Sequence, residues 1–247
     1  MKIAGALFAP REDNKDENKA EVAKIFAEAE DVGARLLIFP EMTLSGFTMN
    51  HALYDPSDME FFEKLAEKYG IAVLFGSIFK QGSNFFNSAV FYDPKSLKKA
   101  IYFKRRLFSY AKEDDFYSRG NKPVQFSFQR LKCSIVICYD LRFPELFRET
   151  KGSELFFVIA SWPKSRKLHW DTLLRARAIE NQAFVVGVNR IGFDADGTDY
   201  GQLSTAFDYF GKRLPSIKTH QLSIWEISGK MVEKMKHWRE TFPVLKE

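Results

Sequence analysis

The feature of this chain that most restricts its fold is a series of short apolar runs separated by segments with helical periodicity. The runs have the length of buried strands and contain few polar residues; they lie at 36–39, 135–137, 155–159 and 184–188. Apolar residues recur at helical spacing across 22–29, 61–69, 170–179 and 231–238. Strands without polar alternation are typical of sheets covered on both faces, and their alternation with helices favours a layered architecture. We therefore expect an α/β fold with large mixed sheets.

Turn and capping residues predict where several elements begin and end. We expect a first strand at 3–8, a helix that begins in the polar segment 13–17 and ends at Gly33, and a right-handed crossover to the next strand. Ser57 and Glu60 fit a capping box, which predicts that Ser57 caps a helix ending at Gly70. Further strands are expected at 71–75, 87–92, 99–103, 124–128 and 133–137.

The size and charge of the chain favour one domain with an ordinary solvated surface. The chain has 247 residues, of which 45% are hydrophobic, and it shows no repeat or linker. Such a length can build one large core, so we expect a single domain over residues 1–247. The net charge of +5 comes from 37 Lys and Arg against 32 Asp and Glu, spread along the chain. Nucleic acid is therefore not an expected partner.

The two cysteines and the N-terminal segment favour a cytoplasmic location. Cys133 and Cys138 are five residues apart on one predicted strand, where side chains alternate between faces, so we expect no disulfide. The apolar run after Met1 ends at Pro10 and is too short for a signal peptide or a membrane span. We therefore expect no association with a membrane.

Three polar residues, Glu41, Lys104 and Cys138, each follow the end of a predicted apolar strand. Ligand sites of open α/β sheets gather at such strand ends, and a carboxylate, an ammonium and a thiol together suit acyl transfer. Cys138 can act as nucleophile and Glu41 as its base, while Lys104 and the N–H of Tyr139 can donate to an oxyanion. The free N–H groups and the dipole of a helix start at Pro144 can favour a thiolate or an oxyanion there.

Each of these residues has a simpler interpretation when it is taken alone. Glu41 can be a surface turn residue, Lys104 can belong to the solvated basic run 104–106, and Cys138 can be a buried structural cysteine. A Cys–His pair is another alternative, for which only His169 follows a strand end and precedes a helix. The sequence has no HExxH motif, no paired CxxC motif and no glycine-rich phosphate loop, so we expect neither a metal nor a cofactor.

The motifs around these three residues resemble those of the nitrilase superfamily of carbon–nitrogen hydrolases. They are FPEM at 39–42 with GF at 46–47, Lys104 before LF at 107–108, and ICYDLRFPE at 137–145. The runs LLRARAIENQ at 173–182 and VNR at 188–190 resemble the omega-amidase branch. The resemblance implies a four-layer α-β-β-α sandwich, a Glu41–Lys104–Cys138 triad that works without metal or cofactor, and a homodimer that pairs through a helix face.

The resemblance also implies a second acidic residue in the loop after the lysine. Glu113, seven residues before Gly120, fits that position best, although Asp114 and Asp115 lie beside it. Its implied role is to orient Lys104 and the attacking group by hydrogen bonds. On spacing alone, Glu113 is also compatible with a solvated loop charge.

The substrate class that the resemblance implies is the omega-amide of a 2-oxo dicarboxylic acid, such as 2-oxoglutaramate. Arg142, four residues after Cys138, matches the position that binds the remote carboxylate, and Trp162 can wall the pocket and donate its indole N–H. Taken alone, Arg142 can pair with Glu145, and Trp162 can be a core aromatic residue.

Two departures from the branch leave the substrate open. Members commonly have Lys-x-His-Leu-Phe, whereas this chain has Arg106 in place of the His, which adds a cation near the site. The chain also contains 25 Phe, which could make the pocket or the dimer face more apolar. The same triad could hydrolyse N-carbamoyl compounds, nitriles or other aliphatic amides. A non-catalytic binding or scaffold member that uses only the dimer surface is a further alternative.

Overall fold

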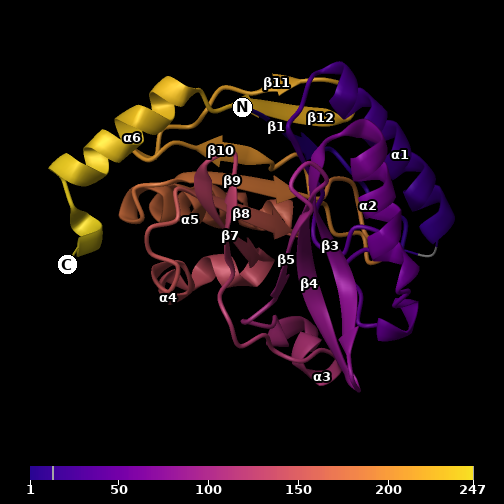
Figure 1. Cartoon of the computed structure of the whole chain (residues 1–247). Helices are drawn as coiled ribbons and strands as arrows, with labels where there is room; N and C mark the ends of the chain where they lie inside the picture. The colour runs from indigo at the N-terminus through magenta and orange to yellow at the C-terminus, as the bar shows by residue number, and fades with distance from the viewer. Residues whose placement is uncertain (13, 247) are drawn as a thin grey trace.

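Two β-sheets packed face to face form the centre of the structure, and helices cover the outer face of each sheet (Figure 1). The computed structural model describes residues 1–12 and 14–246. Within these residues, one sheet has seven strands in the order β11-β12-β1-β2-β3-β4-β5, and the other has five in the order β10-β9-β8-β7-β6. We call them the larger and the smaller sheet.

The elements follow the chain in an order that separates the two sheets. The strands are β1 (Lys2–Ala6), β2 (Leu36–Ile38), β3 (Ala72–Gln81), β4 (Asn84–Asp93), β5 (Lys98–Phe103), β6 (Gln125–Phe128), β7 (Leu131–Ile137), β8 (Leu155–Ala160), β9 (Phe184–Asn189), β10 (Thr205–Phe207), β11 (Ile217–Lys218) and β12 (Leu222–Glu226). The helices are α1 (Lys15–Asp31), α2 (Ser57–Tyr69), α3 (Glu113–Phe116), α4 (Pro144–Arg148), α5 (Lys167–Glu180) and α6 (Gly229–Thr241). Short 3₁₀ turns are η1 (His51–Leu53), η2 (Ser109–Ala111), η3 (Cys138–Arg142), η4 (Lys164–Arg166) and η5 (Val244–Lys246).

Both sheets are mixed, with parallel strands at the centre and antiparallel strands outside. In the larger sheet β1, β2 and β3 run parallel, while β4, β5 and β12 pair antiparallel to their neighbours. In the smaller sheet β7, β8 and β9 run parallel, and β6 and β10 are antiparallel. The parallel strands are the apolar runs that the sequence marked, since such strands are covered on both faces.

The core consists of three apolar layers, which explains the four-layer arrangement. Between the sheets, Ile38 and Leu74 of the larger sheet pack in one cluster with Ile137 and Phe157 of the smaller sheet. A second cluster joins the outer face of the larger sheet to α1 and α2, and a third joins the outer face of the smaller sheet to α4 and α5. The expected α-β-β-α sandwich with two mixed sheets is confirmed.

Two local expectations differ from the structure. Asp55 Oδ1, rather than Ser57, is the capping acceptor of α2, because it accepts from both Ser57 N at 2.9 Å and Ser57 Oγ at 2.7 Å. The predicted capping box is therefore wrong, while Gly70 ends α2 in the left-handed region as expected, at φ +62°. Strands β3 and β4 are also longer than predicted, because they continue as a hairpin to a tight turn at Gly82.

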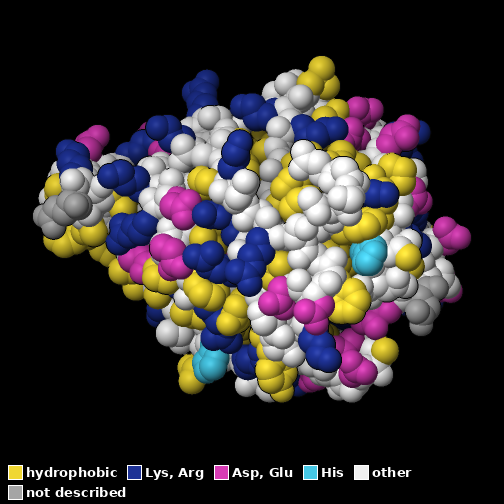
Figure 2. Space-filling model, turned by 90° about the horizontal axis from the view of Figure 1, so that it is seen from below, with side chains coloured by type: hydrophobic (Ala, Val, Ile, Leu, Met, Phe, Trp, Pro, Cys, Tyr) yellow, Lys and Arg dark blue, Asp and Glu magenta, His cyan; other side chains and the backbone are white. Residues whose placement is uncertain are grey.

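The termini and the surface add three further observations. Asn14 caps α1 by accepting from Glu17 N, and residue 13 of the predicted helix start lies outside the described residues. No helix among residues 1–12 and 14–246 is long and apolar enough to cross a membrane. On the face of the molecule that carries α3, both charge signs are spread widely, and Lys and Arg side chains are most dense near the middle (Figure 2).

Candidate active site

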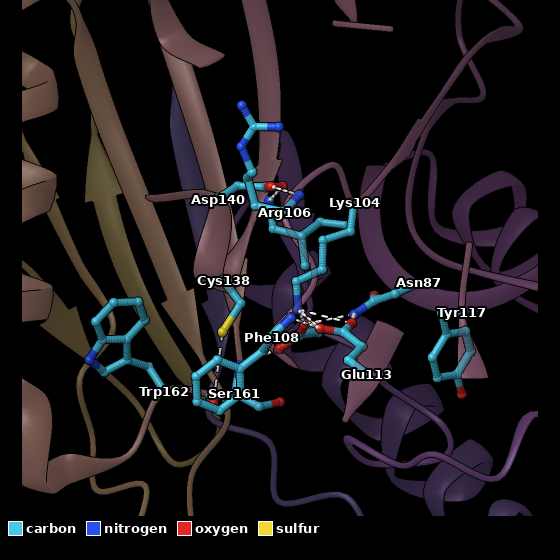
Figure 3. A network of polar contacts seen from close by, with 12 residues as sticks. Asn87, Lys104, Arg106, Phe108, Glu113, Tyr117, Cys138, Asp140, Ser161 and Trp162 are labelled. Carbon is cyan, nitrogen blue, oxygen red and sulfur yellow. Dashed lines mark hydrogen bonds and ion pairs between the residues drawn. The ribbon is translucent and has the colours of Figure 1, made fainter. Parts of the chain in front are cut away.

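The three strand-end residues that the sequence predicts to be catalytic meet between the two sheets. Glu41 follows β2, Lys104 follows β5 and Cys138 follows β7 directly. Lys104 Nζ lies 2.8 Å from Glu41 Oε1, and the thiol of Cys138 lies beside the lysine side chain (Figure 3). The larger sheet therefore supplies the carboxylate and the ammonium, and the smaller sheet supplies the thiol.

Lys104 lies between two buried carboxylates. Its Nζ is 2.8 Å from Glu113 Oε2 and 3.0 Å from Glu113 Oε1, in addition to its contact with Glu41. All three side chains are fully shielded from solvent. Burial alone would lower the pKa of Lys104, but the charges of Glu113 and Glu41 outweigh it and raise that pKa above its usual value. The ammonium of Lys104 is therefore protonated.

Hydrogen bonds fix the positions of both carboxylates. Asn87 Nδ2 donates to Glu41 Oε1 at 2.8 Å and to Glu113 Oε1 at 2.7 Å. The backbone N–H of Phe108 donates to Glu113 Oε2 at 2.7 Å, and the N–H of Ser161 donates to Glu41 Oε2 at 2.9 Å. Because each oxygen has a donor, the cluster keeps one geometry when the cavity is open to solvent.

Cys138 occupies a constrained turn that is tied to the larger sheet. Its φ of +46° lies in the left-handed region, which costs about 1–3 kcal/mol for a residue other than glycine. The carboxylate of Asp140, two residues on, accepts from Ile137 N at 3.0 Å, from Arg106 N at 2.8 Å and from the hydroxyl of Tyr102 at 2.8 Å. These bonds hold the turn that presents the thiol. Burial raises the pKa of Asp140 to about 6.

The expectation that the turn favours a thiolate is wrong. Burial raises the pKa of the Cys138 thiol well above its usual value, and the charge of Glu41 raises it further. Lys104 acts in the opposite direction but is outweighed. The resting thiol is therefore protonated, and it becomes a nucleophile only when a base removes its proton.

The thiol opens onto a cavity of about 720 Å³. Of the residues predicted to bind substrate, Tyr139, Arg142 and Trp162 all line it. The guanidinium of Arg142 stacks on Trp162, with its carbon 4.7 Å from the ring centroid. The indole N–H of Trp162 donates to the carbonyl oxygen of Arg166 at 2.9 Å, so the expectation that it donates into the pocket is wrong. Tyr139 lies in the first turn of η3, where N–H groups lack intrahelical acceptors.

The alternatives for Arg106, Arg142 and His169 are also resolved by their contacts. Arg106, rather than Arg142, pairs with Glu145 at 3.1 Å, and its side chain extends away from the thiol (Figure 3). The extra cation at Arg106 therefore belongs to the surface, and it is not among the residues that line the cavity. His169 Nδ1 lies 3.4 Å from Arg142 Nη2, and His169 neither lines the cavity nor hydrogen-bonds to Cys138. A Cys–His pair has no support in this geometry.

The sequence did not single out four residues that build the site. Asn87 and Asp140 hold the carboxylates and the thiol turn, as described above. Ser161 places its carbonyl oxygen 3.9 Å from Cys138 Sγ, and its own Oγ is buried without a protein partner. A Cβ on Gly76 would lie 2.3 Å from Met42 N, so only glycine lets β3 approach the turn that carries Glu41. The only sequence signal was polar Asn87 within the apolar run of β4.

Within the described part of the chain, no group of three or more His, Cys, Asp or Glu side chains is arranged to hold a metal ion.

Comparisons with known proteins point to one family. The carbon-nitrogen hydrolase family model matches residues 3–237. The chain is 34% identical over 215 residues to the omega-amidase YafV of Escherichia coli (strain K12). This alignment covers 85% of this chain and 83% of that protein. It is 34% identical over 200 residues to the 2-oxoglutaramate amidase of Bacillus subtilis (strain 168), covering 78% and 77% of the two chains.

A solved structure extends the likeness over the whole fold. The CN-hydrolase superfamily protein XC1258 from Xanthomonas campestris, which has an arsenic adduct in its active site, superposes with a TM-score of 0.89 at 27% identity. The superposition covers 100% of this chain and 96% of that one. With the family model, the relatives and the fold in agreement, this chain belongs to the carbon-nitrogen hydrolase family.

Proposed function

We propose that this protein is an amidase that hydrolyses the omega-amide of a 2-oxo dicarboxylic acid resembling 2-oxoglutaramate and releases ammonia. The observation that carries the proposal is a protonated thiol, Cys138, beside a buried Glu41–Lys104–Glu113 cluster at the end of a cavity that Arg142 lines. This arrangement supplies a nucleophile, a base, a fixed cation and an anchor for a carboxylate. Relatives named omega-amidase and 2-oxoglutaramate amidase support the same substrate class.

The first half of the proposed reaction forms a thioester. Cys138 Sγ attacks the amide carbonyl carbon while Glu41 takes the thiol proton. This proton transfer is needed because the raised pKa of Cys138 keeps the resting thiol protonated. Lys104 Nζ and the N–H of Tyr139 donate to the oxyanion that forms. Glu41 then gives the proton to the amide nitrogen, the C–N bond breaks, and ammonia leaves.

The second half hydrolyses the thioester. A water molecule takes the place of ammonia, and Glu41 accepts a proton from it as its oxygen attacks the same carbon. When the second tetrahedral intermediate collapses, the C–S bond breaks and the proton returns from Glu41 to Cys138. Glu113 and Asn87 touch no reacting atom in this scheme; they hold Lys104 and Glu41 in position.

The experiment is a comparison of ammonia release from a panel of substrates at equal enzyme concentration. We expect 2-oxoglutaramate to be hydrolysed faster than an N-carbamoyl α-amino acid, an aliphatic nitrile or propionamide. The nitrile and propionamide have no carboxylate for Arg142 to bind, and the N-carbamoyl α-amino acid holds its carboxylate one bond closer to the scissile carbonyl. Faster turnover of one of the others would replace the proposed substrate with that class while leaving the triad in place.

Substitution of the two cysteines tests the mechanism. Cys138→Ala should abolish turnover with the fold retained, whereas Cys133→Ala, which removes the other free thiol, should leave turnover intact. Retained activity in Cys138→Ala would refute the thioester mechanism. A wild-type enzyme inactive on every member of the panel would favour a binding or scaffold role.

Three further expectations belong to this proposal. Residues 1–247 act as one domain, since the proposed catalytic groups come from both sheets. The protein is a homodimer that pairs through a helix face. A cytoplasmic location stays a prediction, which cell fractionation can test.

A further inference from the structure

A second arginine, Arg166, lines the same cavity as Arg142. It is the last residue of η4, the turn that follows β8 and precedes α5. Its guanidinium carbon lies 5.5 Å from the ring centroid of Phe108, which also lines the cavity. Its backbone is fixed as well, because the indole N–H of Trp162 donates to its carbonyl oxygen at 2.9 Å. Both ends of Arg166 are therefore held against aromatic residues of the cavity wall.

The two guanidinium groups rest on one connected aromatic cluster. Arg142 stacks on Trp162 and lies 5.9 Å from the ring centroid of Tyr139. Tyr139 in turn contacts Phe108, with ring centroids 5.1 Å apart, and Phe108 carries Arg166. Stacking of this kind orients a guanidinium while leaving the donors at its edge free to bind a ligand.

Neither cation has an anionic partner among the described residues. In residues 1–12 and 14–246, no carboxylate lies within ion-pair distance of Arg142 or Arg166. The neighbouring arginines outside the cavity differ, because Arg105 pairs with Glu149 at 2.9 Å and Arg106 pairs with Glu145 at 3.1 Å. Two oriented, unpaired guanidinium groups in one cavity are suited to an anionic ligand with more than one acceptor.

The acidic residues of the cavity are mostly occupied by other groups. Glu12 pairs with the buried guanidinium of Arg190 at 3.3 Å. Asp194 accepts from Thr198 N and from the hydroxyl of Tyr200, both at 2.8 Å. Of the three cations that line the cavity, Lys104 is paired with carboxylates, whereas Arg142 and Arg166 are left to bind a ligand.

We propose that Arg166 is a specificity-determining residue that binds the 2-oxo oxygen of the substrate while Arg142 binds the adjacent carboxylate. This inference rests on the proposed function and adds to it the reason why a 2-oxo acid is preferred. A ketone oxygen accepts hydrogen bonds from a guanidinium. A methylene group at the same carbon offers no acceptor, and an ammonium group there can only donate and is repelled by the cation. Arg166 thus selects 2-oxo acid amides over the corresponding 2-amino acid amides.

Three substrates of equal chain length isolate the contribution of the 2-position. They are 2-oxoglutaramate, glutaramate and L-glutamine, which carry a ketone, a methylene and an ammonium-bearing carbon there. For the wild type we expect kcat/KM to fall in that order. In Arg166→Gln, we expect kcat/KM for 2-oxoglutaramate to fall about 10- to 100-fold, mainly through a rise in KM. A fall of this size corresponds to the loss of one charge-assisted hydrogen bond. Values for glutaramate should change little, so the preference for the ketone should disappear.

Matched variants separate this role from a structural one. Arg142→Gln should lower kcat/KM for all three substrates by the same factor, because all three carry the carboxylate. Arg166→Lys should restore part of the ketone preference, since it keeps the charge but not the planar fork. Lys164→Gln removes a charge from the same turn, where Lys164 pairs with Asp199 at 2.7 Å outside the cavity lining, and should leave the order and the rates unchanged.

The outcomes distinguish the two proposals. If the wild type prefers 2-oxoglutaramate but Arg166→Gln keeps the same ratio over glutaramate, the inference about Arg166 is wrong and the proposed function stands. An equal loss on all three substrates in Arg166→Gln would also overturn it, because that is the signature of a structural role. If the wild type does not prefer 2-oxoglutaramate over glutaramate, both the inference and the proposed substrate fail.

Discussion

At the scale of single residues, the site places a protonated thiol next to a buried carboxylate and a buried ammonium. Burial raises the pKa of Cys138 most, the charge of Glu41 raises it further, and the opposite effect of Lys104 is smaller. In the proposed mechanism the base and the nucleophile are thus coupled, because the carboxylate that adds to the raised thiol pKa is also the group that removes the thiol proton.

This coupling predicts opposite effects of one substitution. Glu41→Gln removes a negative charge beside the thiol, so the apparent pKa for alkylation of Cys138 by iodoacetamide should fall. Amide turnover should fall by about 10²- to 10⁴-fold, because no base remains. Alkylation across a pH series, with the modified peptide identified by mass spectrometry, checks the first effect. A thiol pKa that stays the same or rises in Glu41→Gln would contradict the assigned electrostatics.

Asp140 predicts a pH dependence of stability. Its pKa is raised to about 6 in the folded protein from an ordinary value of 3.8, so the folded state binds an extra proton between these values. Its contribution to the free energy of unfolding is therefore fully present below about pH 4 and falls as pH rises through 6, by about 3 kcal/mol in total. Asp140→Asn should lack this component, whereas Asp31→Asn on the exposed end of α1 should keep it.

Urea unfolding of the wild type and both variants between pH 4 and pH 7 measures this difference. The free energy of the wild type minus that of Asp140→Asn should decrease as pH rises across this range. A difference that is flat or increases with pH would show that Asp140 is not held at a raised pKa.

The residues of the site differed in how far the sequence could predict them. Glu41, Lys104 and Cys138 were predictable because each is a reactive type at the end of an apolar strand. Asn87 and Asp140 were not, because their roles arise from contacts across the fold: Asn87 reaches Glu41 over 46 residues of sequence, and Tyr102 reaches Asp140 over 38. The prediction that the Trp162 indole N–H points into the pocket was wrong because its acceptor is the Arg166 carbonyl. That carbonyl lies in a turn whose path cannot be predicted from the local sequence.

At the scale of elements, the position of Glu41 depends on how closely two strands approach. The backbone of Gly76 in β3 packs against the turn after β2, and an added Cβ would lie 2.3 Å from Met42 N and 2.7 Å from Glu41 Cα. Met42 is itself in the left-handed region, at φ +46°. Both contacts involve backbone, which cannot move aside without moving the carboxylate.

Gly76→Ala should therefore affect both stability and catalysis. We expect a loss of about 1–3 kcal/mol in unfolding free energy from overpacking and a fall of about 10²-fold in kcat from displacement of Glu41. The control is Gly229→Ala at the start of α6, where a Cβ meets no atom within 4 Å and both quantities should stay near wild type. Thermal unfolding and single-turnover kinetics measure the two effects, and a fully active Gly76→Ala would contradict this account.

Most elements were predictable from the sequence because helical periodicity and apolar runs reflect burial on one or both faces. The ends were less predictable. The cap of α2 came from Asp55, two residues before the predicted cap, and β3 continued through the polar residues Lys80 and Gln81, which pair with Phe85 and Asn84 of β4. In that hairpin, cross-strand pairing outweighs the local polarity that indicated a loop.

At the scale of the whole molecule, an aromatic surface on α6 is a candidate for the helix face of the proposed dimer. Phe210, Trp238 and Phe242 stack in a row on and beside α6, with ring centroids 4.7 Å and 4.9 Å apart. Phe210 and Phe242 remain more than half exposed. Exposed aromatic rings in one row are typical of contact surfaces. In Figure 1, α6 extends beyond the two sheets, where a second copy can reach it.

If this surface forms the dimer, charges placed on it should separate the subunits. We expect the double variant Phe210→Glu/Phe242→Glu to sediment as a monomer under conditions where the wild type is a dimer. Leu97→Glu, at an even more exposed apolar position in the turn between β4 and β5, should leave the dimer intact. A monomeric wild type, or a double variant that stays dimeric, would refute this assignment.

The origin of the reacting groups in two different sheets has a consequence for how the chain could be divided. Glu41, Lys104 and Glu113 all precede the exposed segment 121–123, and Cys138 with both cavity arginines follows it. The chain could be expressed as two polypeptides, 1–121 and 122–247, that associate only through noncovalent contacts. The first would contain the two glutamates and the lysine, and the second would contain the cysteine and the two arginines. Strands β11 and β12 of the second piece must also add to the sheet of the first, beside β1. Ammonia release from such a mixture would serve as an assay for fragment complementation, because each piece alone is inert and only their reassembly restores a working enzyme.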